Sequence, residues 1–166
     1  ADLLQVTIRE KQGPAVYFAE LKFMGGGLFE ASYTPIKAGS YEIDVKMGNQ
    51  HIYCGKGKVN KCSPFDMTVV PGTTVPSTSE VESASKYPMD YLVEAVAGEY
   101  ATFQIQAKDA YSNNQIVGGD KFNATITNKA DSQYAYRGNV QDHGDGTYTV
   151  TYTIPMSGLY EMSVTL

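Results

Sequence analysis

Two segments of the chain carry the same pattern of turn glycines and aromatic residues, and this repeat constrains the fold more than any other feature. Residues 25–45 read GGGLFEASYTPIKAGSYEIDV, and residues 144–164 read GDGTYTVTYTIPMSGLYEMSV. They align without a gap at an offset of 119 residues. Two glycines, a Tyr-Thr pair and a later Gly-x-Tyr coincide, which chance would rarely produce. The chain therefore contains two copies of one strand–connection–strand unit.

The copies lie in a chain whose apolar and polar residues alternate with a period of two, which is the pattern of half-buried β-strands. Turn residues separate these segments at intervals of about eight to twelve residues. The chain has 16 Gly, 7 Pro and 13 Tyr, and only 19% of its residues are charged, which favours strands over helices. This predicts an all-β antiparallel sandwich fold. We expect strands at 4–9, 16–23, 28–33, 41–47, 65–70, 100–107, 122–127, 134–140, 148–152 and 160–166.

A change in composition separates the two copies. Residues 71–85 contain many Ser and Thr, two prolines and almost no large apolar side chain, which is typical of a linker. We therefore predict a first repeat at 1–71, a linker at 72–86 and a second repeat at 87–166. Residues 89–96 fit a short helix or an edge strand, and the surrounding β-pattern favours the strand.

The second copy contains a longer motif that resembles a known family. Residues 142–160 read DHGDGTYTVTYTIPMSGLY, which is similar to the D-x-G-D-G-T-Y-x-V-x-Y-x-P-x-x-x-G-x-Y run of filamin-type immunoglobulin repeats. His51-Ile52 and Ser63-Pro64-Phe65 resemble that family's H-I-x-x-S-P-F segment, here interrupted by residues 54–62. The resemblance implies two tandem antiparallel β-sandwich repeats with strands lettered A to G. The first repeat then has C to G without A and B, and the second has A to F without G, so each is incomplete at one end.

The resemblance also implies how the repeats bind. Filamin-type repeats act as spacers and take up a partner strand at an exposed sheet edge, usually the edge formed by strands C and D. The matching residues here are Phe122, Ala124, Ile126, Tyr134, Tyr136 and Val140. The incomplete ends leave two interpretations open. The sequence is a window of a longer tandem array, or neighbouring subunits supply the strands and a head-to-tail filament forms.

Two cysteines and a sequon point to an environment outside the cell. Cys54 and Cys62 flank a short glycine-containing loop, and only His51 is near them as a further metal ligand. We therefore predict a disulfide bond and an oxidising compartment, with two free thiols in a cytosolic protein as the alternative. Asn123-Ala124-Thr125 is an N-glycosylation sequon on a predicted strand, where Asn123 faces solvent if its neighbours face the core.

Several classes of function find no support in the sequence. A net charge of −5 without a basic patch argues against nucleic-acid binding, and no apolar run is long enough for a transmembrane helix. Two Cys and two His are too few for a four-ligand zinc site without carboxylates. Residues 142–146 lack the ligand spacing of an EF-hand and predict an Asp-Gly hairpin turn. With neither a catalytic triad nor a phosphate loop, we expect no enzymatic activity, no cofactor and no small-molecule substrate.

These features together predict a structural or adhesive module of an extracellular or cell-surface tandem-repeat protein or fibre, which binds protein partners at its sheet edges. The alternative is a cytoplasmic, cytoskeletal rod spacer of a filamin-like actin crosslinker that also binds partner peptides. A Cys54–Cys62 bond and a glycan on Asn123 favour the first interpretation, whereas free thiols favour the second.

Overall fold

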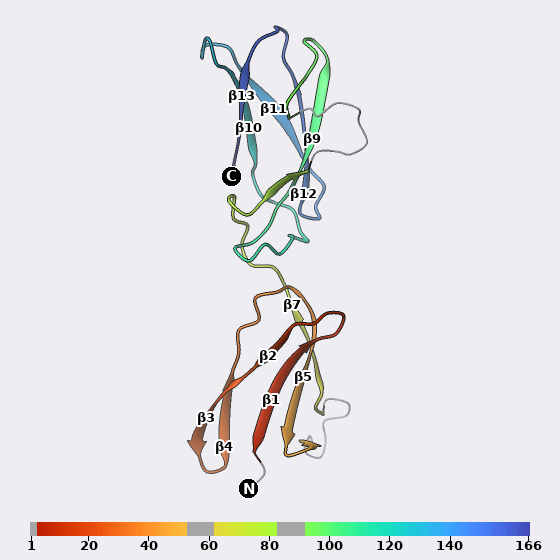
Figure 1. The fold of residues 1–166 in the computed structure, drawn as a ribbon, viewed down its shortest axis with the longest axis vertical. Coiled ribbons are helices and arrows are strands. Elements are labelled where there is room, and N and C mark those ends of the chain that lie inside the picture. Colours follow the sequence, from red (N-terminus) through yellow and green to blue (C-terminus); the bar gives the residue numbers. More distant parts are fainter. Residues whose placement is uncertain (1–2, 53–61, 83–91) are drawn as a thin grey trace. The chain divides into compact units, whose positions relative to one another are not determined.

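A computed structural model describes residues 3–52, 62–82 and 92–166, and every regular element in these ranges is a β-strand (Figure 1). All of the strand pairs are antiparallel. The predicted all-β, antiparallel fold is therefore confirmed. The chain forms two compact units, Ala1–Val70 and Pro71–Leu166.

The first unit is built on a central strand, β1, which pairs with β2 on one side and with β5 on the other (Figure 1). The opposite side of β5 pairs with β7 and, near its end, with β6, while β3 and β4 form a separate hairpin. The strands are β1 (Leu4–Glu10), β2 (Val16–Phe18), β3 (Glu20–Gly25), β4 (Leu28–Ser32), β5 (Gly39–Met47), β6 (Gln50–His51) and β7 (Phe65–Val69).

The second unit contains one continuous path of pairings, β13-β10-β11-β12-β9-β8. The middle strand β11 pairs with β10 through 135–138 and with β12 through 139–142, so it passes from one layer of the sandwich to the other. The strands are β8 (Glu80–Glu82), β9 (Tyr100–Gln106), β10 (Asn123–Asn128), β11 (Ala135–Asp142), β12 (Thr147–Thr153) and β13 (Tyr160–Thr165) (Figure 1).

The core of the second unit follows from the period-two alternation of its strands. Every second residue of β9, β10 and β12 is apolar and buried, because successive side chains of a strand point to opposite faces. Tyr148 is completely buried, and its ring meets that of Phe122 edge-on at 4.8 Å. The fully or nearly fully buried apolar residues are Ala101, Phe103, Ile105, Ala107, Ala124, Ile126, Tyr148, Val150 and Tyr152.

The two units share one strand plan at the offset seen in the sequence. β1, β4 and β5 correspond to β10, β12 and β13, and β2 with β3 corresponds to β11. The predicted strand 16–23 is split at Ala19, the position that corresponds to Gly138 of β11, because the chain changes pairing partner there. In the second unit β9 pairs along the whole of β12, whereas β4 pairs only with β3 among the described strands.

β12 is paired with β9, whereas β4 has no such neighbour among the described strands, and this explains a difference in burial. Phe29 on β4 corresponds to Tyr148 on β12, yet Phe29 is 44% exposed and Tyr148 is not exposed at all. The buried core of the first unit is accordingly small and consists of Val6, Ile8 and Tyr41. Phe29 instead contacts Phe23 across the hairpin, with ring centroids 5.1 Å apart.

The structure corrects the predicted linker at 72–86. Residues 71–82, the part of it that is described, belong to the second unit. Glu80–Glu82 forms β8 and pairs with β9, and Thr74 forms a β-bridge with Asp109. The Ser and Thr side chains that suggested a linker make local and long-range hydrogen bonds, such as that from the Thr78 hydroxyl to the Asp109 carbonyl at 2.8 Å. The strand expected within 89–96 is absent from its described part, 92–96.

A buried carboxylate fastens this segment to the second unit. Asp109 is 3% exposed and accepts hydrogen bonds from the backbone N–H groups of Gly72, Tyr111 and Asn113 at 2.8–2.9 Å. The Asn113 side-chain amide donates a further bond at 2.9 Å. Burial alone raises the pKa of Asp109, but these hydrogen bonds to its charged form outweigh it and hold the pKa at about 2.

The paired positions Tyr148 and Phe29 give the first prediction. We expect Tyr148→Ala to destabilise the second unit by roughly 3–5 kcal/mol, because it empties a filled core site. Phe29→Ala at the equivalent, half-exposed site should change the free energy of unfolding of the first unit by less than about 1 kcal/mol. Calorimetric or denaturant unfolding of each variant, with transitions assigned to the units, measures both. Equal losses at the two sites would contradict the structure.

Asp109 gives the second prediction, which concerns pH. Because its pKa is lowered on folding, its stabilising contribution is fully present above the unfolded-state value near 3.8 and is lost as the pH falls towards about 2. Asp109→Asn should therefore destabilise the second unit at neutral pH and flatten the dependence of unfolding on pH between about 4 and 2. Asp131→Asn, at an exposed turn carboxylate, is the control and should retain the steep acid limb.

Candidate functional site

The tyrosine of each Gly-x-Tyr motif closes a loop of its own sandwich. The Tyr41 hydroxyl donates a hydrogen bond to the Lys37 carbonyl at 2.7 Å, and the Tyr160 hydroxyl donates to the Met156 carbonyl at 3.0 Å. Both bonds reach back four residues, as in the tyrosine corner of immunoglobulin-like sandwiches. Burial raises the pKa of Tyr41 to about 12, with a further contribution from Tyr17 beside it.

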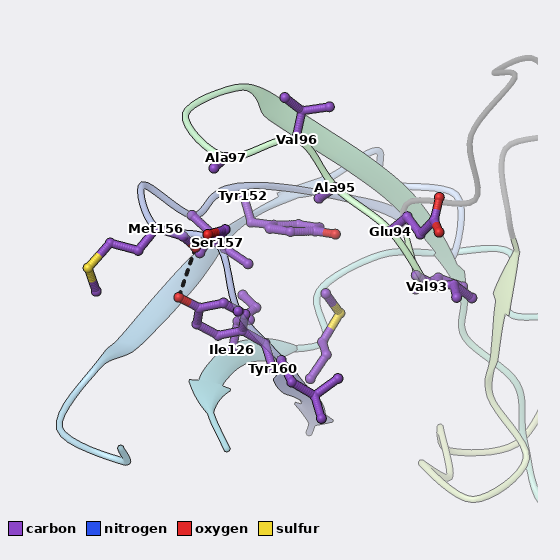
Figure 2. A pocket seen from close by; sticks show the side chains of 15 residues that line it. Val93, Glu94, Ala95, Val96, Ala97, Ile126, Tyr152, Met156, Ser157 and Tyr160 are labelled. Atoms are coloured by element: carbon purple, nitrogen blue, oxygen red, sulfur yellow. Dashed lines mark hydrogen bonds between the residues drawn. The ribbon is translucent and has the colours of Figure 1, made fainter. Parts of the chain in front are cut away.

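Beside the second of these corners lies a cavity of about 270 Å³. Figure 2 shows residues 93–97 along one side of it and Ile126 and Tyr160 on the other, with Tyr152 between them. Met162 of β13 and Ile154 of the β12–β13 connection complete the apolar lining. Glu94 is the lining residue that carries a charge.

The cavity lies beside β13, whose Tyr160 and Met162 line it. This strand pairs with β10 along its whole length, from Tyr160 opposite Asn128 to Thr165 opposite Asn123. Among the described residues no strand pairs with its other side. The side chains of β13 alternate between half-buried and exposed. In the first unit the corresponding strand, β5, is paired on that side by β7, which follows it in the same chain.

The residues predicted to form the partner-binding edge lie on two strands with different pairings. β11, which carries Tyr136 and Val140, pairs only with β10 through 135–138 and only with β12 through 139–142, so among the described strands it is the edge strand of each layer. β10 has β11 on one side and β13 on the other, so its backbone is already paired. Ala124 and Ile126 are core residues, and the half-buried Phe122, Tyr136 and Val140 pack against that core. Tyr134 precedes β11 and is the one member of the set with a largely exposed side chain. The alternation of apolar and polar residues along a strand shows which of its faces is buried, but it does not show which strands pair with it.

Two further predicted sites have different outcomes. Asn123 begins β10 and is exposed, as expected for a residue that could carry a glycan. Cys62 is exposed, but Cys54 lies outside the described residues, so the disulfide stays a prediction.

His51 has another role, since its Nδ1 lies 2.9 Å from the Ser63 hydroxyl oxygen, which accepts a bond from the Val45 N–H at 2.7 Å. The His-Ile and Ser-Pro-Phe segments therefore anchor the first unit.

The Asp-Gly turn at 142–146 binds its own backbone. Asp145 accepts hydrogen bonds from the N–H and the hydroxyl of Thr147, and Asp142 accepts from the N–H groups of Gly144 and Gly119. These bonds are those of a hairpin turn. Gly146 has φ of +87°, and a Cβ there would lie 2.3 Å from the Gln115 carbonyl oxygen, so the motif requires glycine at this position.

The residues of the cavity were missed in the sequence, although the repeat contains their signal. Tyr152, Tyr160 and Met162 align with Tyr33, Tyr41 and Ile43 of the first unit. We interpreted the aligned tyrosines only as core and cross-strand residues. The strands that lie over these residues differ between the two units. That difference is visible only once the strand pairings are known.

Two further features are absent from residues 3–52, 62–82 and 92–166. No group of three or more His, Cys, Asp or Glu side chains there is arranged to hold a metal ion. The same ranges contain no helix with the length and apolarity needed to cross a bilayer.

Comparison with known proteins places these features in a family. The filamin/ABP280 repeat matches residues 71–166, more than half of the chain. Filamin-C of Rattus norvegicus and Filamin-C of Mus musculus are each 29% identical to it over 164 residues, which is 97% of this chain. The chain spans only 5% of the length of these relatives. Together with the antiparallel sandwich, the tyrosine corners and the Asp-Gly turn, the match over 71–166 shows that the chain belongs to the filamin/ABP280 repeat family.

Proposed function

We propose that the chain is a structural and protein-binding stretch of a cytoplasmic, cytoskeletal filamin-like protein, a rod spacer whose sheet edges take up partner strands. The support is the family match over 71–166 and the similarity to two filamins along 97% of the chain. Relatives of this kind favour the alternative interpretation of the sequence, the intracellular actin-crosslinker spacer, over the extracellular one. The role of the whole protein in crosslinking actin is part of this proposal.

The observation that carries the binding role is the open side of β11, which among the described strands pairs only with β10 through 135–138 and only with β12 through 139–142. Added strands gain affinity from main-chain hydrogen bonds and specificity from pockets that receive alternate side chains. The open side of β11 offers main-chain groups for such hydrogen bonds.

An extracellular adhesive module is the second candidate function. The observation that favours it is the exposure of both Asn123 and Cys62, which makes the sequon accessible to glycosylation and the thiol accessible to a partner. The exposed thiol is equally compatible with a reducing cytoplasm. The two functions differ in the covalent state of these residues, which can be measured without knowing a partner.

The third prediction separates the two compartments. In protein taken from its own cells and alkylated without reductant, we expect Cys54 and Cys62 both to be labelled and Asn123 to carry no glycan, because a reducing cytoplasm prevents both modifications. Intact-mass and peptide mass spectrometry measures this. The same material after reduction gives the reference for full labelling. A blocked cysteine pair together with an Asn123 glycan would support the extracellular function instead.

A further inference from the structure

The same strand edge is open in both units. Among the described strands β2 pairs only with β1, and the first half of β11, residues 135–138, pairs only with β10. Tyr17 of β2 lies opposite Ile8, as Tyr136 of β11 lies opposite Ile126. The strands that only one unit has do not cover this edge, because β9 pairs with β8 and β12 in the second unit and β7 pairs with β5 in the first. The opening therefore belongs to the strand plan that the units share.

The hydrogen bonds of β11 show which of its backbone groups face the open side. In an antiparallel ladder, alternate residues of a strand direct their N–H and C=O groups to the same neighbour. The Tyr134 carbonyl accepts a hydrogen bond from the Asn128 N–H at 3.0 Å, which continues the register of the β10–β11 pair. The N–H and C=O groups of Ala135 and Arg137 consequently point away from β10 and are available to an added strand.

β2 offers the same backbone groups with different side chains. The Ala19 N–H donates to the Val6 carbonyl at 3.1 Å, so the N–H and C=O groups of Val16 and Phe18 point away from β1. Phe18 is 77% exposed, and it has the place in its strand pair that Arg137 has in the other. A neighbouring strand would therefore meet an aromatic ring at one edge and a guanidinium at the other.

The charge of Arg137 has no counterpart in its surroundings. Its side chain is exposed, and none of the ion pairs within the described residues includes it. Its neighbours on the same face are uncharged, with Thr125 directly opposite on β10 and Ala135 and Asn139 along β11. A residue opposite Arg137 on an added strand would meet this positive charge, which attracts a carboxylate and repels an ammonium group. Two copies of the edge paired about Arg137 would place like charges opposite each other, which disfavours self-pairing.

We propose that the open side of β11 at 135–138 binds an extended segment of a partner polypeptide with an acidic residue opposite Arg137, and that Arg137 gives this edge a charge selectivity that the edge at Phe18 lacks. The inference rests on the proposed strand-binding function. It adds the residue that selects the partner and the charge that the partner carries. The half-buried Tyr17 and Tyr136 are the same in both units, so they do not distinguish one partner from another.

The fourth prediction uses a palindromic peptide as the probe. Labelled SVTVEVTVS, whose glutamate can lie opposite Arg137 in either strand direction, is titrated into the full chain, as are versions with lysine or glutamine at the centre. Fluorescence anisotropy gives the affinities, and NMR shifts of the β11 and β2 amides identify the edge that is bound. At β11 we expect the glutamate peptide to bind about threefold to tenfold more tightly than the lysine peptide, in the range of a reversed cross-strand charge pair. At β2 the three peptides should bind alike.

Substitutions in the protein test the role of the single side chain. Arg137→Glu reverses the charge at an exposed position and should make the lysine peptide the tighter ligand of β11. Lys121→Glu changes the net charge equally at another exposed position of the second unit and should leave the preference for the glutamate peptide unchanged. Phe18→Arg should give β2 the same preference, because the backbone groups of the two edges match.

Three outcomes would overturn the proposal. Equal binding of the peptides at β11, or a preference that Arg137→Glu does not alter, would remove the selectivity and leave strand binding in place. Unchanged β11 amide shifts with every peptide would remove strand binding at this edge as well. A chain whose mass rises with concentration until the glutamate peptide is added would place a second copy on the edge. None of these results affects the thiol and glycan measurement, so failure of the selectivity, of the edge and of the proposed compartment can be told apart.

Discussion

One strand in each unit has to belong to both layers of the sandwich, and the rest of the architecture depends on this crossing. β11 pairs with β10 through its first half and with β12 through its second, and β2 and β3 divide the same task at Ala19. The crossing residue must be small. A Cβ at Gly138 would lie 2.6 Å from a Val150 methyl and 3.1 Å from the Ala124 Cβ, distances that the close-packed core cannot absorb without a shift.

The two units show that a local motif sets the frame and that distant strands complete the packing. The tyrosine corner and the strand order around it recur at the same offset. Tyr33 and Tyr152 share their motif, but Tyr33 is 37% exposed and Tyr152 only 5%. The difference arises because β9 lies along β12, while β4 pairs only with β3 among the described strands. A shared Tyr-Thr motif therefore gives a buried tyrosine in one unit and an exposed tyrosine in the other.

Much of the fold could be predicted from the sequence because local patterns of apolar, polar and turn residues determine it. Alternation placed β1 and β12 within about a residue of their ends, and the repeat indicated their common plan. The segment at 72–86 was misjudged because its Thr and Ser side chains are anchored by partners about 30 residues away, such as Thr78 at the Asp109 carbonyl. Composition cannot show such long-range hydrogen bonds. The predicted binding residues on β10 lie on a strand that is paired on both sides, because Ala124 and Ile126 indicate burial but not the neighbours of their strand.

The buried Asp109 has a mechanical consequence. Tension applied to the chain at Val70 reaches Gly72 almost at once, and the Gly72 N–H is held by the Asp109 carboxylate while its carbonyl is held by the Gln115 amide. These contacts stand at the head of the segment, ahead of the ladder between β8 and β9. Tension along the chain therefore loads the buried carboxylate before it loads that ladder.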